Sequence, residues 1–205
     1  LLEEAVEERS LEDLAVVGTP CQIKGLRALM TGDNEIKKFS SRVKLAIGLF
    51  CSESFTYEGL FEEKLEGQMG IEASDIQKLN IKGKLIVDLK DGSTKELSLS
   101  DLEDYVFSPC KVCSDFSAEL ADISVGGVGS PKGYTTILVR TNSGLDSFER
   151  AMEWGAFTAT DLDEVKPGIG LVEKLSSKKK REAEETIESY RKSSKKIPPR
   201  SRKNA

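Results

Sequence analysis

The stretch VKLAIGLFC at residues 43–51 decides the fold, because it is apolar and nearly continuous, interrupted only by Lys44. A run of this kind, without alternation of polar and apolar residues, is typical of a strand that other elements cover on both faces. Such strands occur in sheets with helices packed on them. The stretch therefore predicts an α/β protein, with Cys51 at the end of a central strand.

Extended and helical patterns alternate on both sides of this strand. Residues 14–17 form a shorter apolar strand, and apolar residues then recur at helical spacing over 23–30. Residues 76–99 have the pattern of a β-hairpin with an Asp-Gly turn at 91–92. Further strands are predicted at 122–125 and 135–140, and further helices at 1–8, 55–69 and 145–154. We expect an α/β fold with α+β character: a mixed sheet with flanking helices, an inserted β-hairpin and a C-terminal helix.

The chain is acidic over most of its length and basic at its end. Residues 175–205 hold eleven lysines and arginines against four glutamates, so this segment carries +7 and residues 1–174 carry −12. A shift of this size predicts two parts, a folded domain over 1–174 and a basic helical tail over 175–205. The helix should start after Gly168 and end before Pro198, with the last residues disordered.

Neither a membrane span nor an export signal is predicted. The longest uncharged run is ten residues, 14–23, and a transmembrane helix needs about 20. The first residues, Leu1-Leu2-Glu3-Glu4, do not form a signal peptide. We expect a cytoplasmic chain that begins inside a longer protein or has been trimmed.

The sequence contains no histidine. This absence excludes Ser-His-Asp and Cys-His catalysis and histidine-ligated zinc. Any chemistry must use cysteine, carboxylate, lysine, tyrosine or a bound cofactor, and the sequence indicates no catalytic side chain.

The four cysteines have a distinctive placement. Cys21 follows the first predicted strand, Cys51 ends the second, and Cys110 and Cys113 form a CxxC pair in a predicted loop. If the two strands are parallel, their ends lie at one edge of the sheet, which that loop can reach. Four thiolates there could hold a 4Fe-4S cluster or a zinc ion. Other interpretations are isolated buried thiols and disulfides of an oxidising compartment.

A glycine-rich loop follows the predicted strand at 122–125. Its sequence, GGVGSPKG at 126–133, lacks the Gly-Lys-Ser/Thr of a P-loop and the third glycine of a dinucleotide fingerprint, and no helix follows it. Glycines still allow backbone N–H groups to approach an anion, and Lys132 adds a positive charge. The loop is either a plain turn or a segment that contacts a cofactor.

Five motifs together resemble one protein family. They are GTPCQ at 18–22, GLFCSESF at 48–55, CKVCSDFSAELADIS at 110–124, GGVGSPKGYT at 126–135 and VKPGIGLVEKL at 165–175. This combination is similar to the beta subunit of coenzyme F420-reducing hydrogenase and to its relatives in formate dehydrogenase, the membrane-linked F420 dehydrogenase and F420-dependent sulfite reductase. The resemblance extends from about residue 14 to residue 175.

The resemblance implies an archaeal oxidoreductase subunit of methanogenesis that carries FAD and one 4Fe-4S cluster and takes coenzyme F420 as substrate. It implies cluster ligands at Cys21, Cys51, Cys110 and Cys113. It implies flavin contacts at Gly126, Gly127, Gly129, Ser130, Lys132, Gly133 and Thr135. Family members have a further N-terminal portion, which we expect to precede this chain.

Partners follow from the same resemblance. We expect the catalytic redox subunits of a hydrogenase, formate dehydrogenase or related complex, no nucleic acid, and membrane association only through a partner.

Near the CxxC pair, Asp115, Glu119 and Asp122 are interpreted as a solvated helix face, or alternatively as charges that lower the cluster's reduction potential. The alternative function is a zinc-stabilised four-cysteine binding module whose basic tail contacts nucleic acid or a partner.

Overall fold

The computed structural model describes residues 1–32, 35 and 37–197. These residues divide into two compact units. Unit 1 comprises Leu1–Ser52 and Val112–Ala205, and unit 2 comprises Glu53–Lys111. The predicted disorder at the end of the chain falls on residues outside the described ones.

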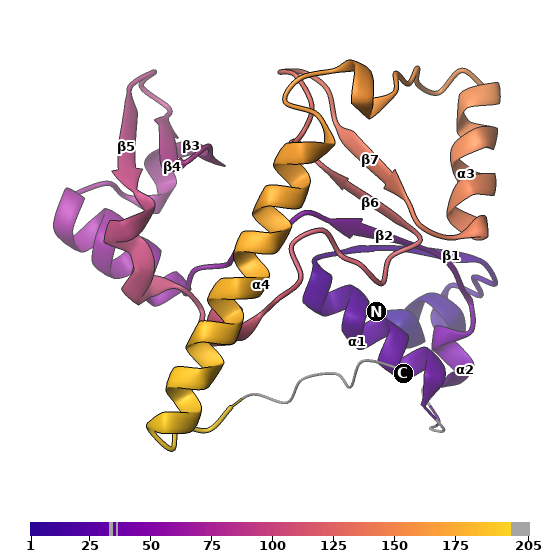
Figure 1. Cartoon of the computed structure of the whole chain (residues 1–205), viewed down its shortest axis with the longest axis horizontal. Coiled ribbons are helices and arrows are strands. Elements are labelled where there is room, and N and C mark those ends of the chain that lie inside the picture. Colours follow the sequence, from indigo (N-terminus) through magenta and orange to yellow (C-terminus); the bar gives the residue numbers. More distant parts are fainter. Residues whose placement is uncertain (33–34, 36, 198–205) are drawn as a thin grey trace. The chain divides into compact units, whose positions relative to one another are not determined.

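Unit 1 contains a four-stranded mixed sheet, which confirms the predicted fold class (Figure 1). The strand order is β1-β2-β6-β7, in which β1, β2 and β6 are parallel and β7 is antiparallel to β6. The strands are β1 (Leu14–Gly18), β2 (Val43–Leu49), β6 (Ile123–Gly126) and β7 (Thr136–Val139).

Strand β2 is less enclosed than its sequence predicts. Ala46 and Gly48, on one face, are buried, whereas Leu49 on the other face is 39% exposed. The covered face packs against helix α1 and the segment 118–121, and their side chains form one apolar cluster with the strand. The cluster consists of Ile23, Leu26, Val43, Ala46, Ala118 and Ala121.

The helices of unit 1 connect and flank these strands. Helices α1 and α2 lie together on one side of the sheet (Figure 1). Helix α1 begins after Thr19, whose backbone N–H donates to the Gln22 side chain at 2.8 Å, a contact typical of a capped helix start. The α-helices are α1 (Pro20–Thr31), α2 (Lys37–Ser40), α3 (Asn142–Glu153) and α4 (Ile169–Lys192), and the short helical segments are η1 (Glu4–Glu8) and η6 (Leu162–Glu164).

Unit 2 contains the predicted hairpin within a three-stranded antiparallel sheet that has its own apolar core. Strands β4 and β5 form the predicted hairpin, and Gly92 in its turn has a φ of +87°, which suits glycine. The elements are η2 (Glu58–Gln68), η3 (Ala73–Asp75), β3 (Ile76–Ile81), β4 (Lys84–Leu89), β5 (Thr94–Ser98), η4 (Leu99–Tyr105) and η5 (Ser108–Val112).

Helix α4 runs without interruption through the boundary predicted at residues 174–175. It ends at Lys192, earlier than Pro198 would require, because Ser194 adopts a left-handed φ of 54° and the Lys195 N–H turns back to the Tyr190 carbonyl at 2.9 Å. Several of its basic residues pair with glutamates one turn away. These pairs are Lys178–Glu182, Arg181–Glu185 and, in reverse order, Lys192–Glu188.

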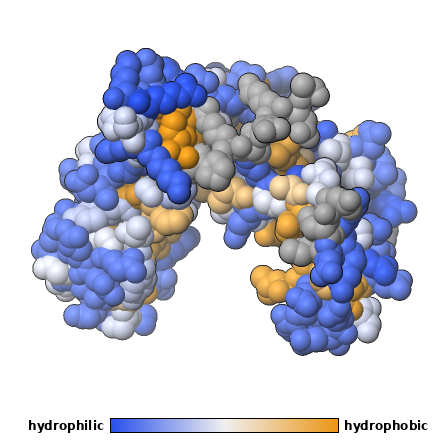
Figure 2. Space-filling view, turned by 90° about the horizontal axis from the view of Figure 1, so that it is seen from below, coloured by the Kyte–Doolittle hydropathy of each residue, from blue (hydrophilic) through white to orange (hydrophobic). Residues whose placement is uncertain are grey.

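Hydrophilic residues predominate on the face shown in Figure 2, with apolar residues in separate groups. Within the described part of the chain, no helix combines the length and the apolar character that crossing a bilayer requires.

Candidate metal and cofactor site

Two cysteines lie at the same edge of the unit 1 sheet. Strands β1 and β2 are parallel, as the sequence predicts, and Gly18 at the end of β1 is opposite Gly48 near the end of β2. Cys21 follows in the first turn of α1, where its side chain is exposed, and Cys51 follows β2 with a half-buried side chain. The C-terminal ends of these strands therefore present two thiols at one edge.

Cys113 reaches this edge through the segment that follows it. The Cys51 N–H donates to the Phe116 carbonyl at 2.8 Å, and the rings of Phe50 and Phe116 lie 5.4 Å apart. Ala118 packs so closely on β2 that a Cβ at Gly48 would meet its methyl group at 2.2 Å. Only glycine at position 48 allows this approach, so the sequence places the Cys113 segment against the end of β2.

Cys110 lies in helix η5, near the end of unit 2. Its N–H donates to the Phe107 carbonyl at 2.8 Å, and its link to Cys113 is the short CxxC spacing. All four cysteines carry thiols. As the side chains stand, no three cysteine, aspartate or glutamate groups among the described residues converge tightly enough for a metal ion.

Hydrogen bonds reach the sulfur atoms of Cys21 and Cys113. The Thr19 Oγ1 lies 3.2 Å from the Cys21 Sγ, and the Cys113 Sγ donates to the Asp115 carbonyl at 3.7 Å. Both carboxylate oxygens of Asp115 accept from the Glu119 N–H, at 3.2 and 3.1 Å. Burial raises the pKa of Asp115 above its usual value, and the hydrogen bond from Glu119 offsets part of this rise.

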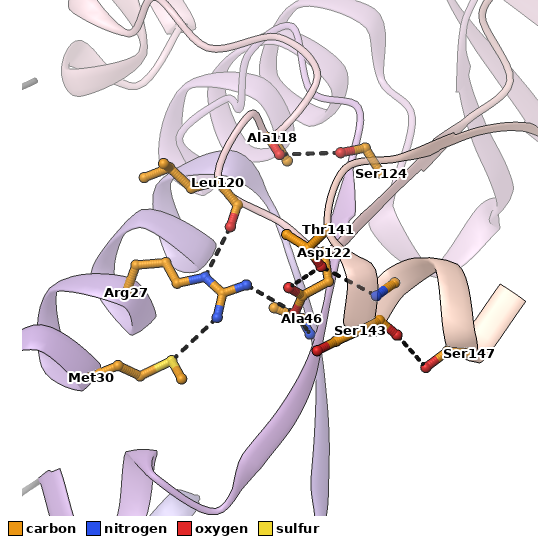
Figure 3. A network of polar contacts seen from close by, with 11 residues as sticks. Arg27, Met30, Ala46, Ala118, Leu120, Asp122, Ser124, Thr141, Ser143 and Ser147 are labelled. Atoms are coloured by element: carbon orange, nitrogen blue, oxygen red, sulfur yellow. Dashed lines mark hydrogen bonds and ion pairs between the residues drawn. The ribbon is translucent and has the colours of Figure 1, made fainter. Parts of the chain in front are cut away.

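None of Asp115, Glu119 and Asp122 lies on a helix, which corrects that interpretation, and Asp122 is not solvated either. It is 6% exposed, just before β6, and Figure 3 shows it at the centre of a polar network. Its Oδ2 pairs with Arg27 at 2.9 Å and accepts from the Ala46 N–H at 2.8 Å, and its Oδ1 accepts from Thr141 at 2.8 Å. A carboxylate with these partners holds α1, β2 and the start of α3 together.

The glycine loop divides into a packed part and an open part. A Cβ at Gly126 would meet the Phe50 ring at 2.3 Å, and one at Gly129, where φ is +97°, would meet Val172 of α4 at 3.0 Å. In contrast, a Cβ at Gly127 or Gly133 would have no neighbouring atom within 4 Å. Packing thus accounts for Gly126 and Gly129, and the left-handed φ of +93° accounts for Gly133, beside exposed Lys132, whereas Gly127 is exposed and has neither constraint.

The remaining predicted contacts of this loop are internal or exposed. The Ser130 hydroxyl hydrogen-bonds to Thr136, and Thr135 is exposed. Two hollows in the described surface lie elsewhere, beside the β4–β5 turn and along the end of α4, and no cysteine lines them.

Sequence reasoning missed one residue at the sheet edge, Lys179 of α4. Its Nζ donates to the Cys51 carbonyl at 2.6 Å, across 128 positions of sequence. The signal was a lysine at helical spacing from the apolar residues Val172 and Ala183. The contact places α4 beside the backbone that follows β2.

Fold and site define an α/β protein whose sheet edge carries cysteines. The chain belongs to the coenzyme F420 hydrogenase/dehydrogenase beta subunit family, because the family model for the C terminus of this subunit matches residues 11–165.

Similar proteins agree with this assignment. The chain is 41% identical over 188 residues to the coenzyme F420 hydrogenase subunit beta of Methanococcus voltae, covering 91% of this chain and 66% of that protein. It is 39% identical over 198 residues to the coenzyme F420-dependent sulfite reductase of Methanocaldococcus jannaschii, covering 90% and 29% respectively. The chain thus spans slightly less than two thirds of that hydrogenase subunit.

A solved structure is also similar. A chain of the F420-reducing NiFe hydrogenase complex from Methanosarcina barkeri superimposes with a TM-score of 0.88 at 31% identity, over 96% of this chain and 68% of that one.

Proposed function

We propose that this chain is part of an electron-transfer subunit that takes hydride from, or gives it to, coenzyme F420 and exchanges electrons with a catalytic partner subunit. In this proposal Cys21, Cys51, Cys110 and Cys113 hold a 4Fe-4S cluster. The observation that carries it is the common edge at which Cys21, Cys51 and the Cys113 segment meet in unit 1. The names of the similar proteins support the F420 chemistry and the partner subunits.

The four cysteine side chains are chemically suited to bind an iron–sulfur cluster. Four thiols without histidine are the ligands that iron–sulfur clusters prefer. A cluster of several atoms holds its ligand sulfurs farther apart than a single ion does, so a ligand group spread along a sheet edge suits it better than zinc. The chain's part is to hold the thiolates and, through the Thr19 hydroxyl beside Cys21, to tune their charge.

The open part of the glycine loop is the proposed flavin contact. When bound, FAD would link the two-electron hydride chemistry of a deazaflavin to the one-electron chemistry of a cluster. Gly127 and Gly133 offer accessible backbone, and Lys132 offers a cation for a phosphate. Gly126 and Gly129 are in addition required by the packing of the loop itself.

No observation favours the zinc-stabilised binding module. A tail that binds nucleic acid should present basic side chains without acidic partners. Within the described residues, however, Lys179 contacts Cys51 and Lys180 contacts Glu119. Three more basic residues pair with glutamates of α4, namely Lys178, Arg181 and Lys192.

Serine substitution tests the cluster. Anaerobically purified wild type should be brown, absorb broadly near ~400 nm and contain about four irons per chain. Cys21→Ser, Cys51→Ser, Cys110→Ser and Cys113→Ser should each lose most of the iron, because thiolates ligate a cluster. Ser114→Ala, beside Cys113, is the matched control and should keep it. A colourless wild type that contains zinc would overturn the proposal.

Two substitutions test the flavin contact in the full chain. Gly127→Val should obstruct a ligand, since its Cβ would meet no protein atom within 4 Å, and Lys132→Glu should repel a phosphate. Both should therefore lower the flavin that heat releases. Iron content should not change. Lys82→Glu on the exposed surface of unit 2 is the control, and normal flavin in both loop variants would leave the loop as a plain turn.

A further inference from the structure

Lys179 occupies an unusual position on α4. Val172, Ala183 and Ile187 are 2–3% exposed and form one buried stripe at helical spacing. Lys179 lies on the same stripe, seven residues after Val172 and four before Ala183, and is half-buried. A charged group in this place is costly unless it has a partner.

The partner is the backbone of a proposed cluster ligand. Lys179 Nζ donates to the Cys51 carbonyl at 2.6 Å, which is the short length of a charge-assisted hydrogen bond. The Cys51 N–H is held from the other side by the Phe116 carbonyl at 2.8 Å. Both backbone polar groups of Cys51 are therefore fixed, although β2 ends at Leu49.

Neighbouring contacts hold α4 in this place. Lys180 pairs with Glu119, in the segment after the CxxC pair. At the start of the helix, the Gly168 N–H donates to the Gly129 carbonyl of the glycine loop at 2.9 Å. The helix between Gly168 and Lys179 spans about 16 Å, so α4 connects the loop to the cysteine edge.

Acidic groups of the segment after the CxxC pair lie near this part of α4. They are Asp115 and the paired Glu119.

We propose that Lys179 is a positioning residue that fixes Cys51 at the sheet edge, and that its positive charge raises the reduction potential of the cluster bound there. The inference rests on the proposed function. Reduction adds negative charge to a cluster, and a nearby cation stabilises the reduced form in a partly desolvated site.

The test compares three substitutions of Lys179 with a control on the same helix. Lys179→Met removes the charge and the hydrogen bond, Lys179→Gln keeps a donor without charge, and Lys179→Arg keeps both. Lys178→Met is the control, because Lys178 is exposed and pairs with Glu182. Iron content, the rate of iron release to a chelator and the cluster's midpoint potential are measured for each full-length variant.

We expect Lys179→Met to release iron faster and to lower the equilibrium constant for reduction about tenfold, ~59 mV for one electron. Lys179→Gln should show the lower potential with slower iron release than Lys179→Met, and Lys179→Arg should resemble wild type. Loss of all iron from Lys179→Met but not from Lys179→Arg also supports positioning.

Two results would overturn the inference alone. One is iron-loaded Lys179→Met with wild-type release rate and potential, and the other is an equal shift in Lys178→Met. Wild type without iron would instead overturn the proposed function, and the inference with it.

Discussion

The two units of this chain are stabilised in different ways. Unit 2 is a local structure whose core lies entirely within residues 60–102 and includes Leu60, Leu65, Leu85, Val87, Leu97 and Leu102. Unit 1 joins segments from both ends of the chain, and its core includes the small residues Ala46, Ala118 and Ala121. A buried carboxylate, Asp122, ties these segments together.

The difference has a functional consequence. Small side chains and glycine allow the segment after Cys113 to lie directly on β2, so that backbone contacts can place the thiols. Large side chains fill the core of unit 2, and Cys110 lies in its last helical turn.

The largest expected effect comes from Asp122→Ala. The substitution leaves the partly buried Arg27 guanidinium without its carboxylate and the Ala46 N–H without its acceptor, which should cost about 3–5 kcal/mol. Urea denaturation measures the loss. Asp13→Ala removes only the exposed pair with Lys44, and an equal loss there would contradict the assigned role of Asp122.

The next largest loss of stability is expected from Leu65→Ala. Leu65 is fully buried in unit 2, and the cavity should cost about 2–5 kcal/mol. Hydrogen exchange should show lost protection in β3–β5 with β1 and β2 less affected, since the units have separate cores. Met69→Ala, on a 37% exposed side chain, should change stability by no more than ~0.5 kcal/mol. Equal loss of protection in both units would show that they unfold together.

Glycine-to-alanine substitutions should change the free energy of unfolding in opposite directions at two positions, one in each unit. Gly92→Ala puts a Cβ at φ +87° in the unit 2 turn and should destabilise by about 1–2 kcal/mol. Gly25→Ala within α1 of unit 1 meets no atom within 4 Å and should stabilise by about 0.5–1 kcal/mol. Thermal melting compares the two, and the same sign for both would contradict the turn geometry or the helix assignment.

Apart from the controls, Thr141→Ala should have the smallest destabilising effect. The Thr141 hydroxyl accepts from the Gly144 N–H at the start of α3 and donates to Asp122. Its loss should cost about 1 kcal/mol, visible in urea denaturation. Ser143→Ala, at an exposed position in the first turn of α3, is the control. Because Thr141 and Asp122 share a contact, the effects of Thr141→Ala and Asp122→Ala should not add.

Local patterns in the sequence were enough for the main elements and for part of the site. The apolar run at 43–51 predicted β2, and the Asp-Gly pair predicted the hairpin of β4 and β5. The order strand, cysteine, strand, cysteine predicted that Cys21 and Cys51 share an edge once the strands are parallel. These predictions succeeded because periodicity and turn chemistry act over a few residues.

Only the tertiary structure decided which charged and small residues matter. Asp122 bonds to Ala46 across 76 positions and Lys179 to Cys51 across 128, and no periodicity in the sequence connects such residues. Likewise, Gly129 is indistinguishable from Gly127 in sequence, but only Gly129 packs on α4. The sequence by itself determined the elements and the thiols; the tertiary structure decided their partners, because burial and hydrogen bonding depend on segments that meet only in the folded chain.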